Sequence, residues 1–366
     1  MPCRGSLVRP RWPRRRDAMT LSIRHEVLQL RLAQPFRISR ADHGTGESAT
    51  TVIVELRDSR FPDVVGLGEG WPARFFGETP ETMVAVMPLL LEAAGAPEPT
   101  AEGLRGASER VERAIRWNGA AKCALDSALH DLVGKVAGQP VHRLLGLPAE
   151  GPPTDFSIGL DEPAVVAERA RRAADFPALK IMVGGPADLP TLEAVRAVYG
   201  GALRVDANTG WTPSVARELL PRLVELGVEL IAQPFPVARR DWLADLQVAS
   251  PLPIVADESC VEAADLEGLV GSVAGVNVKL AKCGGPGPAA RMLRRARELG
   301  FRTFLGCMEE TSLGVAAAAA VASLAEWTDL DGPLLLAADP FEGLELGSDH
   351  RWRLTDRPGL GVQRRA

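Results

Sequence analysis

The sequence predicts an α/β fold, in which an N-terminal α+β capping domain precedes a parallel (β/α)8 barrel and the C-terminal segment completes the cap. The chain has 366 residues, of which 46% are hydrophobic, and this is enough for about two domains with sizeable cores. From about residue 120 onwards, short β-rich runs alternate with helical segments rich in Ala, Leu, Arg and Glu. This alternation is typical of a barrel whose active groups lie at the carboxyl ends of its strands.

The predicted cap occupies residues 19–120. Alternating apolar positions predict strands at Leu21–Leu32 and Thr50–Leu56, which suit an antiparallel sheet. Pro80 precedes the segment Glu81–Ala94, which predicts a helix with proline in its first turn. Together these elements predict an α+β unit.

The predicted barrel occupies residues 121–338, and residues 339–366 are expected to return to the cap. Each helical segment between two strands makes a crossover, so the strands should lie parallel and end at one common mouth. The eight candidate strands are Thr154–Gly159, Ala178–Val183, Leu203–Asn208, Val228–Pro234, Pro253–Ser259, Gly275–Lys282, Thr303–Glu309 and Trp327–Asp331.

Composition favours a cytoplasmic protein with a small-molecule ligand. The formal net charge of -5 offers no general attraction to nucleic acid or to an anionic membrane, and the five scattered cysteines predict no disulfides. Residues 1–18 carry six Arg without an apolar signal segment, so we expect a disordered extension, with Met19 as a second candidate start. The apolar run Val315–Ala325 is far shorter than the ~20 residues that span a bilayer and predicts a buried helix. The composition does not distinguish a monomer from a homo-oligomer.

Two carboxylates predict a metal site at the mouth of the barrel. Asp206 and Asp257 fall at the ends of the third and fifth predicted strands, and converging carboxylates are the hard oxygen ligands that Mg²⁺ prefers. Alternatively, each aspartate caps the helix that follows its strand. The shared position of the two residues favours metal binding.

A lysine inside the barrel predicts proton transfer. Strand alternation directs Lys279 inward and Lys282 nearer the solvated rim. Desolvation and a neighbouring dication would lower the pKa of Lys279, which makes it a candidate acid–base group.

Asp329 and Asp331 lie at the end of the eighth predicted strand, two residues apart, so they share a face and suit a substrate ammonium group. The alternative for either aspartate is a loop or capping acid.

Several stretches, in this order and at barrel spacing, resemble the enolase superfamily. Within it, the chain is similar to the muconate-lactonizing subgroup and, most closely, to dipeptide epimerases of the Ala-Glu type. The stretches are Arg74-Phe-Phe-Gly-Glu-Thr79, the segment 120–135, Val205-Asp-Ala-Asn208, Ala256-Asp-Glu-Ser259, the segment 277–285, the segment 306–314 and Asp329-Leu-Asp331.

The resemblance implies dipeptide epimerisation. A Mg²⁺ ion would hold the substrate carboxylate and stabilise an enediolate, while two lysines exchange the α-proton on opposite faces. Position by position, the resemblance makes Asp206 and Asp257 the metal ligands and Lys279 the base on the sixth strand. It makes Asp329 and Asp331 the pair that binds the substrate ammonium group. Lys180 would support the substrate carboxylate and the neighbouring base.

Two central positions depart from the family pattern. Met182 replaces the second lysine of Lys-x-Lys, and Ala232 replaces the glutamate of Glu-Gln-Pro, which is the middle metal ligand. Strand alternation predicts that Gln233 and Glu258 point away and do not compensate. We therefore expect impaired epimerisation, because methionine has no proton to give. The alternatives are a catalytically silent dipeptide-binding barrel and one-base chemistry by Lys279, which would explain Met182 but not Ala232.

The substrate side chains are expected to meet the cap loops. The resemblance places the loops Arg37–Gly46 and Arg74–Glu78 over the mouth, with Arg74 among the substrate-binding residues. Met308 and Glu309 would contact the C-terminal residue of a dipeptide. Glu309 would favour a basic or polar side chain there, and the alternative is a rim carboxylate in water.

Overall fold

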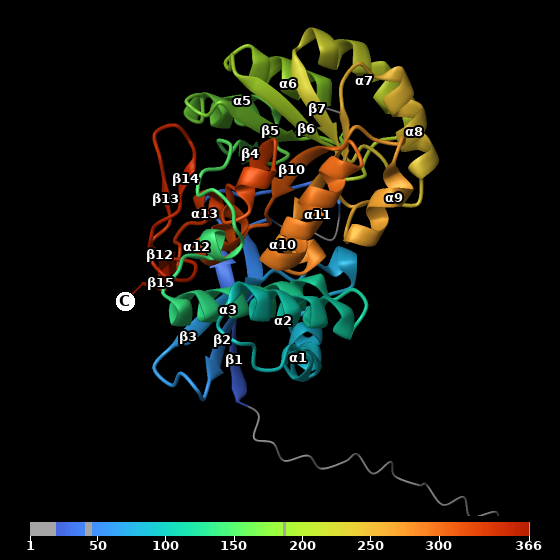
Figure 1. Cartoon of the computed structure of the whole chain (residues 1–366). Helices are drawn as coiled ribbons and strands as arrows, with labels where there is room; N and C mark the ends of the chain where they lie inside the picture. Colours follow the sequence, from blue (N-terminus) through green and yellow to red (C-terminus); the bar gives the residue numbers. More distant parts are fainter. Residues whose placement is uncertain (1–19, 41–45, 186–187, 366) are drawn as a thin grey trace, which may run out of the picture.

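A cap and a barrel lie one above the other in the computed structural model (Figure 1). The structure describes residues 20–40, 46–185 and 188–365, so the predicted extension and part of the loop Arg37–Gly46 lie outside the described residues. In Figure 1 the cap is blue to teal, the barrel runs from green to orange, and the C-terminal segment is red. This arrangement confirms the predicted fold class.

The cap is a three-stranded antiparallel sheet covered by helices, and both predicted strands are present. Its first long helix begins at the predicted proline, and the Thr82 amide donates to the Thr79 hydroxyl at 3.3 Å, which caps the helix. The elements are β1 (Leu21–Arg31), β2 (Ser48–Asp58), β3 (Val65–Gly70), η2 (Arg74–Phe76), α1 (Pro80–Ala94), α2 (Ala101–Ala114), α3 (Gly119–Ala137) and α4 (Val141–Leu144).

Helix α3 packs directly on strand β3. The sequence places the start of the barrel at residue 121, and buried residues of α3 share a core with the cap sheet. Alternate glycines on β3 allow the close approach, because a Cβ on Gly68 would lie 2.0 Å from the Ala124 carbonyl oxygen. The same holds for Gly66 against Ala128 and for Gly70 against Ala120.

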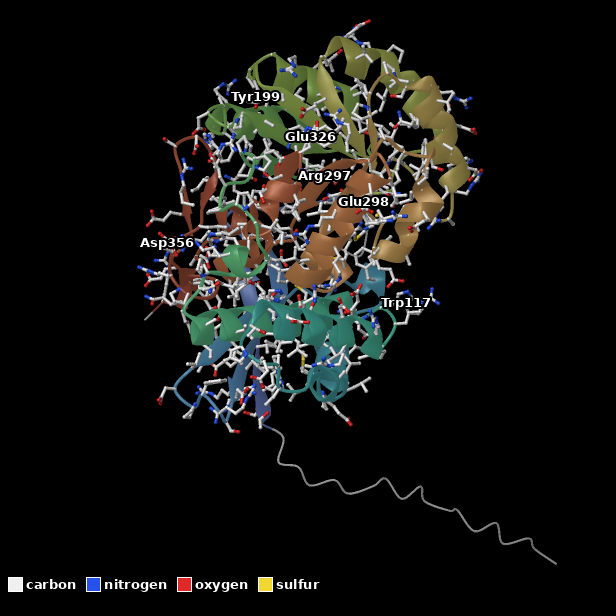
Figure 2. All side chains as sticks on the ribbon, in the orientation of Figure 1. Trp117, Tyr199, Arg297, Glu298, Glu326 and Asp356 are labelled. Carbon is white, nitrogen blue, oxygen red and sulfur yellow. The ribbon has the colours of Figure 1, made fainter. Side chains whose placement is uncertain are left out.

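Helices α2 and α3 meet in a tight turn at the junction of cap and barrel. Trp117 and Asn118 both adopt left-handed backbone conformations there, with φ angles of 59° and 58°. The indole of Trp117 is 63% exposed and lies at the outer edge of the molecule (Figure 2). The turn therefore presents a large aromatic surface to solvent.

All eight predicted barrel strands are present, and each is shorter than its predicted range. They form one parallel sheet in sequence order, which closes where Thr154 bridges Thr328. The strands are β4 (Phe156–Ile158), β5 (Ala178–Met182), β6 (Ala202–Asp206), β7 (Val228–Ala232), β8 (Ile254–Ala256), β9 (Gly275–Lys279), β10 (Arg302–Gly306) and β11 (Trp327–Asp329).

Helices cover the outside of the barrel, as the alternation predicts. Their buried faces share one large core with the outward-facing strand residues. The helices are α5 (Pro163–Arg172), α6 (Asp188–Arg196), α7 (Pro213–Glu225), α8 (Arg240–Ala249), η3 (Ala263–Asp265), α9 (Leu266–Leu269), α10 (Leu280–Cys283), α11 (Pro286–Glu298), α12 (Ser312–Ala319), η4 (Ala322–Leu324) and α13 (Gly332–Leu335).

Bulky side chains fill the barrel beneath its mouth. Leu230, Val255, Phe304 and Trp327 form a separate buried cluster with Ala232. Such filling makes the barrel interior a packed core rather than a pore. Ligands therefore have access only from the carboxyl ends of the strands.

The C-terminal segment lies against both the cap and the barrel. Arg364 donates to Glu26 of β1 at 2.6 Å, and the Leu360 amide donates to Asp131 of α3 at 2.8 Å. Trp352 donates to the Leu330 carbonyl of the barrel at 2.8 Å. The strands of this segment are β12 (Phe341–Glu342), paired with β15 (Gln363–Arg364), and β13 (Glu345–Leu346), paired with β14 (Trp352–Arg353).

The apolar run Val315–Ala325 is buried, although it is not one continuous helix. Helix α12 ends at Ala319, and the short helix η4 follows. Among the described residues, no helix is both long and apolar enough to cross a membrane. The four cysteines in the described part of the chain are free and buried, in keeping with the prediction of no disulfides, and Cys3 lies outside it.

Candidate active site

A cavity of about 70 Å³ opens at the carboxyl ends of the barrel strands, beneath the cap. The cap contributes apolar side chains to it, including Phe36, Ile38 and Trp71. From the barrel, the cavity wall includes nine residues of interest: Lys180, Met182, Asp206, Asp257, Lys279, Met308, Glu309, Asp329 and Asp331. Nearly all residues singled out in the sequence therefore converge on one cavity.

Arg74 and Ala232 are the exceptions. Arg74 is exposed and lines a neighbouring outer cleft of about 670 Å³ instead of the mouth cavity. Ala232 is completely buried at the end of β7, between β6 and β8, and its methyl group belongs to the apolar cluster beneath the mouth. The position between the two predicted metal ligands therefore supplies no side-chain oxygen.

Lys180 lies at the centre of an ion-pair network. Its Nζ atom is 2.8 Å from Oδ2 of Asp329 and 2.9 Å from Oδ2 of Asp206, and all three side chains are buried. Burial alone would lower the pKa of Lys180, but the carboxylates of Asp206 and Asp329 raise it well above its usual value. Lys180 is therefore a fixed cation that supports both walls of the cavity.

Asp257 is surrounded by positive charge. Nζ of Lys282 lies 2.6 Å from its Oδ1 atom, Nζ of Lys279 lies 3.2 Å from Oδ2, and the Asn277 amide donates to Oδ2 at 2.9 Å. Although burial would raise the pKa of Asp257, the two lysines hold it far below its usual range. Asp257 therefore stays ionised.

The structure corrects the prediction for Lys282. Its side chain is fully buried, and Nζ also donates to the Asp257 carbonyl at 2.6 Å and to the Asn277 carbonyl at 2.9 Å. Strand β9 ends at Lys279, and helix α10 starts there, so the strand alternation that predicts a solvated Lys282 does not extend to this residue. The lysine points beneath the mouth.

Lys279 and Met182 face each other from opposite walls. Their strands, β9 and β5, are four positions apart in the eight-stranded barrel, and both side chains line the cavity. Burial alone would lower the pKa of Lys279, but the Asp257 carboxylate raises it. Within these ion pairs, Lys279 carries its proton at neutral pH.

Gln233 and Glu258 each follow a predicted ligand position, and their side chains point in different directions. Gln233 points away from the cavity, as predicted, and its amide donates to Ser259 Oγ and to the Phe235 carbonyl, each at 2.8 Å. Glu258 lines the cavity, which is contrary to the prediction, because β8 ends at Ala256 and the chain turns there. Its carboxylate pairs with Arg40 from the cap.

Asp329 and Asp331 share one face, as predicted. Ser157 holds both, because its hydroxyl donates to Asp329 at 3.0 Å and its amide donates to Asp331 at 2.6 Å. Burial and the nearby Asp329 charge raise the pKa of Asp331 to about 8. Despite burial, the Lys180 ammonium lowers the pKa of Asp329 to about 2. The two carboxyl groups thus differ in charge near neutral pH.

Sequence reasoning missed Ser157 and Arg40 as individual site residues. Ser157 lies on β4, two residues after Asp155, and a polar residue at the end of the first strand was the available signal. Arg40 belongs to the loop expected over the mouth, and its guanidinium lies 4.4 Å from the Phe75 ring of η2. Ser39 beside it donates to the Ala207 carbonyl at 2.7 Å. These contacts fasten the cap loop to the barrel.

Met308 and Glu309 both line the mouth cavity. Met308 Sδ is 4.0 Å from Lys279 Nζ, and Glu309 is only 5% exposed and also borders the outer cleft. Glu309 is thus not a rim carboxylate in water. Both residues line the mouth cavity, and only Glu309 of the two also borders the cleft.

The donor set does not fit a divalent ion held by three carboxylates. Among residues 20–40, 46–185 and 188–365, no three His, Cys, Asp or Glu side chains are placed to hold a metal. Asp206 Oδ1 accepts a hydrogen bond from the Asn208 amide at 2.9 Å, and Oδ2 lies 2.9 Å from Lys180 Nζ. Both Asp257 oxygens already accept hydrogen bonds. Two carboxylates remain, and all four of their oxygens already have partners in the protein.

Comparison with known proteins agrees with this fold. Residues 18–146 match the mandelate racemase/muconate lactonizing enzyme N-terminal domain, and residues 164–365 match the enolase C-terminal domain-like family. The L-Ala-D/L-Glu epimerase of Bacteroides thetaiotaomicron is 35% identical over 92% of this chain and 86% of its own. The L-Lys-D/L-Arg epimerase of Methylococcus capsulatus is 36% identical over 90% of this chain and 95% of its own.

A solved relative shares the whole architecture. The dipeptide epimerase of Enterococcus faecalis V583, complexed with Mg and the dipeptide L-Leu-L-Tyr, superposes with a TM-score of 0.85 at 32% identity, covering 94% of this chain and 99% of the other. The expected cofactor of the family, Mg²⁺, is thus found in that relative. Since both parts of the chain match one family over nearly their whole length, the chain belongs to the enolase superfamily, among its dipeptide epimerases.

Proposed function

We propose that this chain binds dipeptides at its barrel mouth and that its two-sided epimerisation is impaired. The observation that carries the proposal is Met182, which occupies the wall opposite Lys279. Epimerisation needs a proton donor and acceptor on each face of the planar intermediate, and a thioether supplies neither. One face of a bound substrate would therefore lack acid–base chemistry.

Dipeptide binding is supported by the polar groups that converge on the cavity. Asp329 offers a carboxylate and Asp331 a carboxyl group for a substrate ammonium group, and Ser157 orients both. Lys180 and Lys279 offer ammonium groups for a substrate carboxylate. The same cavity thus has complementary charge for both ends of a zwitterionic peptide, and the named relatives act on dipeptides.

On the face of the substrate next to β9, Lys279 would donate or remove the α-proton. Because its pKa is raised, Lys279 is chiefly a proton donor, and removal of a proton requires that its pairing with Asp257 first weaken. Lys180 does not replace the missing base, because Asp206 and Asp329 hold its ammonium group in place. When bound in this family, Mg²⁺ supplies charge stabilisation to the substrate carboxylate.

The test is incubation with L-Ala-L-Glu and related dipeptides in D2O with Mg²⁺. We expect at most slow deuterium incorporation at the α-carbon, and far less epimer formation. Rapid epimerisation would contradict the proposal and would show that another residue serves as the second base. Binding is measured separately by calorimetry, where Asp331→Asn should weaken dipeptide affinity.

Two alternative proposals account for the same cavity. A catalytically silent dipeptide-binding barrel would show binding without deuterium exchange. One-base chemistry by Lys279 would show exchange without inversion, and it accounts for Met182 but not for Ala232.

We also propose a cytoplasmic location, which the unpaired, buried cysteines of the described chain support.

A further inference from the structure

The carboxylates at the barrel mouth are already neutralised by basic side chains of the chain itself. Asp206 pairs with Lys180, while Asp257 pairs with Lys279 and Lys282. Lys180 also pairs with Asp329, so three ammonium groups balance three carboxylates. Two of these ammonium groups, those of Lys180 and Lys279, face the same cavity that would receive a ligand carboxylate.

Lys282 is a permanent part of this arrangement. Its ammonium group is inaccessible to solvent and donates to three acceptors, which are the Asp257 carboxylate, the Asp257 carbonyl and the Asn277 carbonyl. Displacing a buried ammonium group from its partners leaves an uncompensated charge, which is strongly destabilising. One Asp257 oxygen is therefore committed to Lys282 in any state of the site.

A divalent ion between Asp206 and Asp257 would meet repulsion from this arrangement. Ala232 between them is buried and apolar, so no third carboxylate offsets the added charge. The ion would compete for the carboxylates of Asp206 and Asp257 with ammonium groups that already pair with them, and like charges a few ångströms apart repel strongly away from bulk water. The side chains that bind the carboxylates thus oppose the metal.

We infer that Lys180, Lys279 and Lys282 supply the positive charge of this site in place of a divalent ion, so that the mouth takes the carboxylate of a dipeptide without a metal. The inference rests on the proposed dipeptide binding and specifies what holds the ligand. Lys180 and Lys279 line the cavity and contact the ligand carboxylate, while Lys282 fixes Asp257 from beneath. Metal-independent binding then distinguishes this chain from its Mg-complexed relative.

The metal half of the inference is tested with Mn²⁺, whose free aqueous signal in electron paramagnetic resonance disappears on binding. The unaltered protein should leave Mn²⁺ free at concentrations at which the Ala232→Glu variant binds it. Equal Mn²⁺ affinity of the two proteins would overturn the inference, because a metal site would then exist without the third carboxylate. Thermal melting of both proteins confirms that each is folded.

The ligand half is tested by calorimetry of L-Ala-L-Glu binding in EDTA and in millimolar Mg²⁺. We expect dissociation constants that agree within about twofold. Binding that requires Mg²⁺ would overturn the inference and leave the proposed function intact. No binding in either buffer would overturn the proposed function, and this inference with it.

A matched pair of variants separates the ammonium groups from general stability. Lys279→Gln should lower dipeptide affinity in EDTA on the order of tenfold, because one charged contact is lost. Lys135→Gln is the control, since it removes a lysine that pairs with Asp131 at 2.6 Å in the cap, away from the mouth. Equal effects of the two variants would contradict a direct role of Lys279.

Discussion

Lys279 and Met182 face each other across the barrel mouth, from strands four positions apart in an eight-stranded barrel. One wall thus carries an ammonium group and the other a thioether. Proton exchange on two faces needs an ionisable group on each wall, and our proposal of impaired epimerisation rests on this relationship.

Restoring the missing base and the missing metal ligand together should restore epimerisation. Met182→Lys alone should recover little, because metal and base act as a unit and their effects are not additive. Loss of an acid–base group commonly costs ~10²–10⁴-fold, so Met182→Lys with Ala232→Glu should raise the epimerisation rate by a factor of that order or more. The rate is followed as epimer formation from L-Ala-L-Glu.

Lys279→Ala is the control in that double variant and should abolish its activity. Full activity after this substitution would show that Lys279 is not the base of its face.

Mg²⁺ affinity should depend on position 232. Ala232→Glu places a carboxylate between Asp206 and Asp257, which completes a three-oxygen donor set and offsets the neighbouring ammonium groups. We expect weak Mg²⁺ binding by the unaltered protein and clearly tighter binding by the variant in calorimetry. If the unaltered protein binds Mg²⁺ as tightly, another group supplies the missing oxygen.

The stability of the cap should fall as pH rises towards neutrality. Glu78 accepts the Ala120 amide at 3.1 Å, at the start of α3, but burial raises its pKa to about 7 from 4.5. Because the folded state binds this proton more tightly, the stabilisation is full below about pH 4.5 and is lost as pH rises through about 7. The loss is on the order of 3 kcal/mol or less.

Glu78→Gln should therefore flatten the pH dependence of the free energy of unfolding, measured with urea over that range. Glu81→Gln is a suitable control, since Glu81 is exposed on the same helix region and its pKa is lowered. The interpretation fails if the Glu78 variant keeps the full slope.

The contact between β3 and α3 should not tolerate a methyl group. Gly68→Ala would place Cβ 2.0 Å from a backbone carbonyl oxygen of α3, so strand and helix must separate. We expect a loss of about 1–3 kcal/mol in the free energy of unfolding, as for other overpacked cores. Gly200→Ala is the matched control, because its Cβ would meet no atom within 4 Å. An unchanged stability for Gly68→Ala would show that this interface is not tightly packed.

The residue pattern alone was enough to predict the barrel, its eight strands and the convergence of the polar residues that follow them. Asp206, Asp257, Lys279 and Asp329 could be placed at one mouth because the parallel repeat carries every strand end to the same side. Met182 and Ala232 were identified through the resemblance, since each stands where a motif of the enolase superfamily has another residue.

The folded arrangement was needed to show where strand alternation stops and which charged groups form pairs. Strand periodicity predicts side-chain direction only within a strand, so Lys282 beyond β9 and Glu258 beyond β8 were both placed on the wrong side. The pairing of Lys180 with Asp329 joins residues 149 positions apart, and no local pattern encodes such a distance. Lysines and carboxylates from separate strand ends pair at the barrel mouth, because the strands pack side by side. This packing determines the electrostatics of the site.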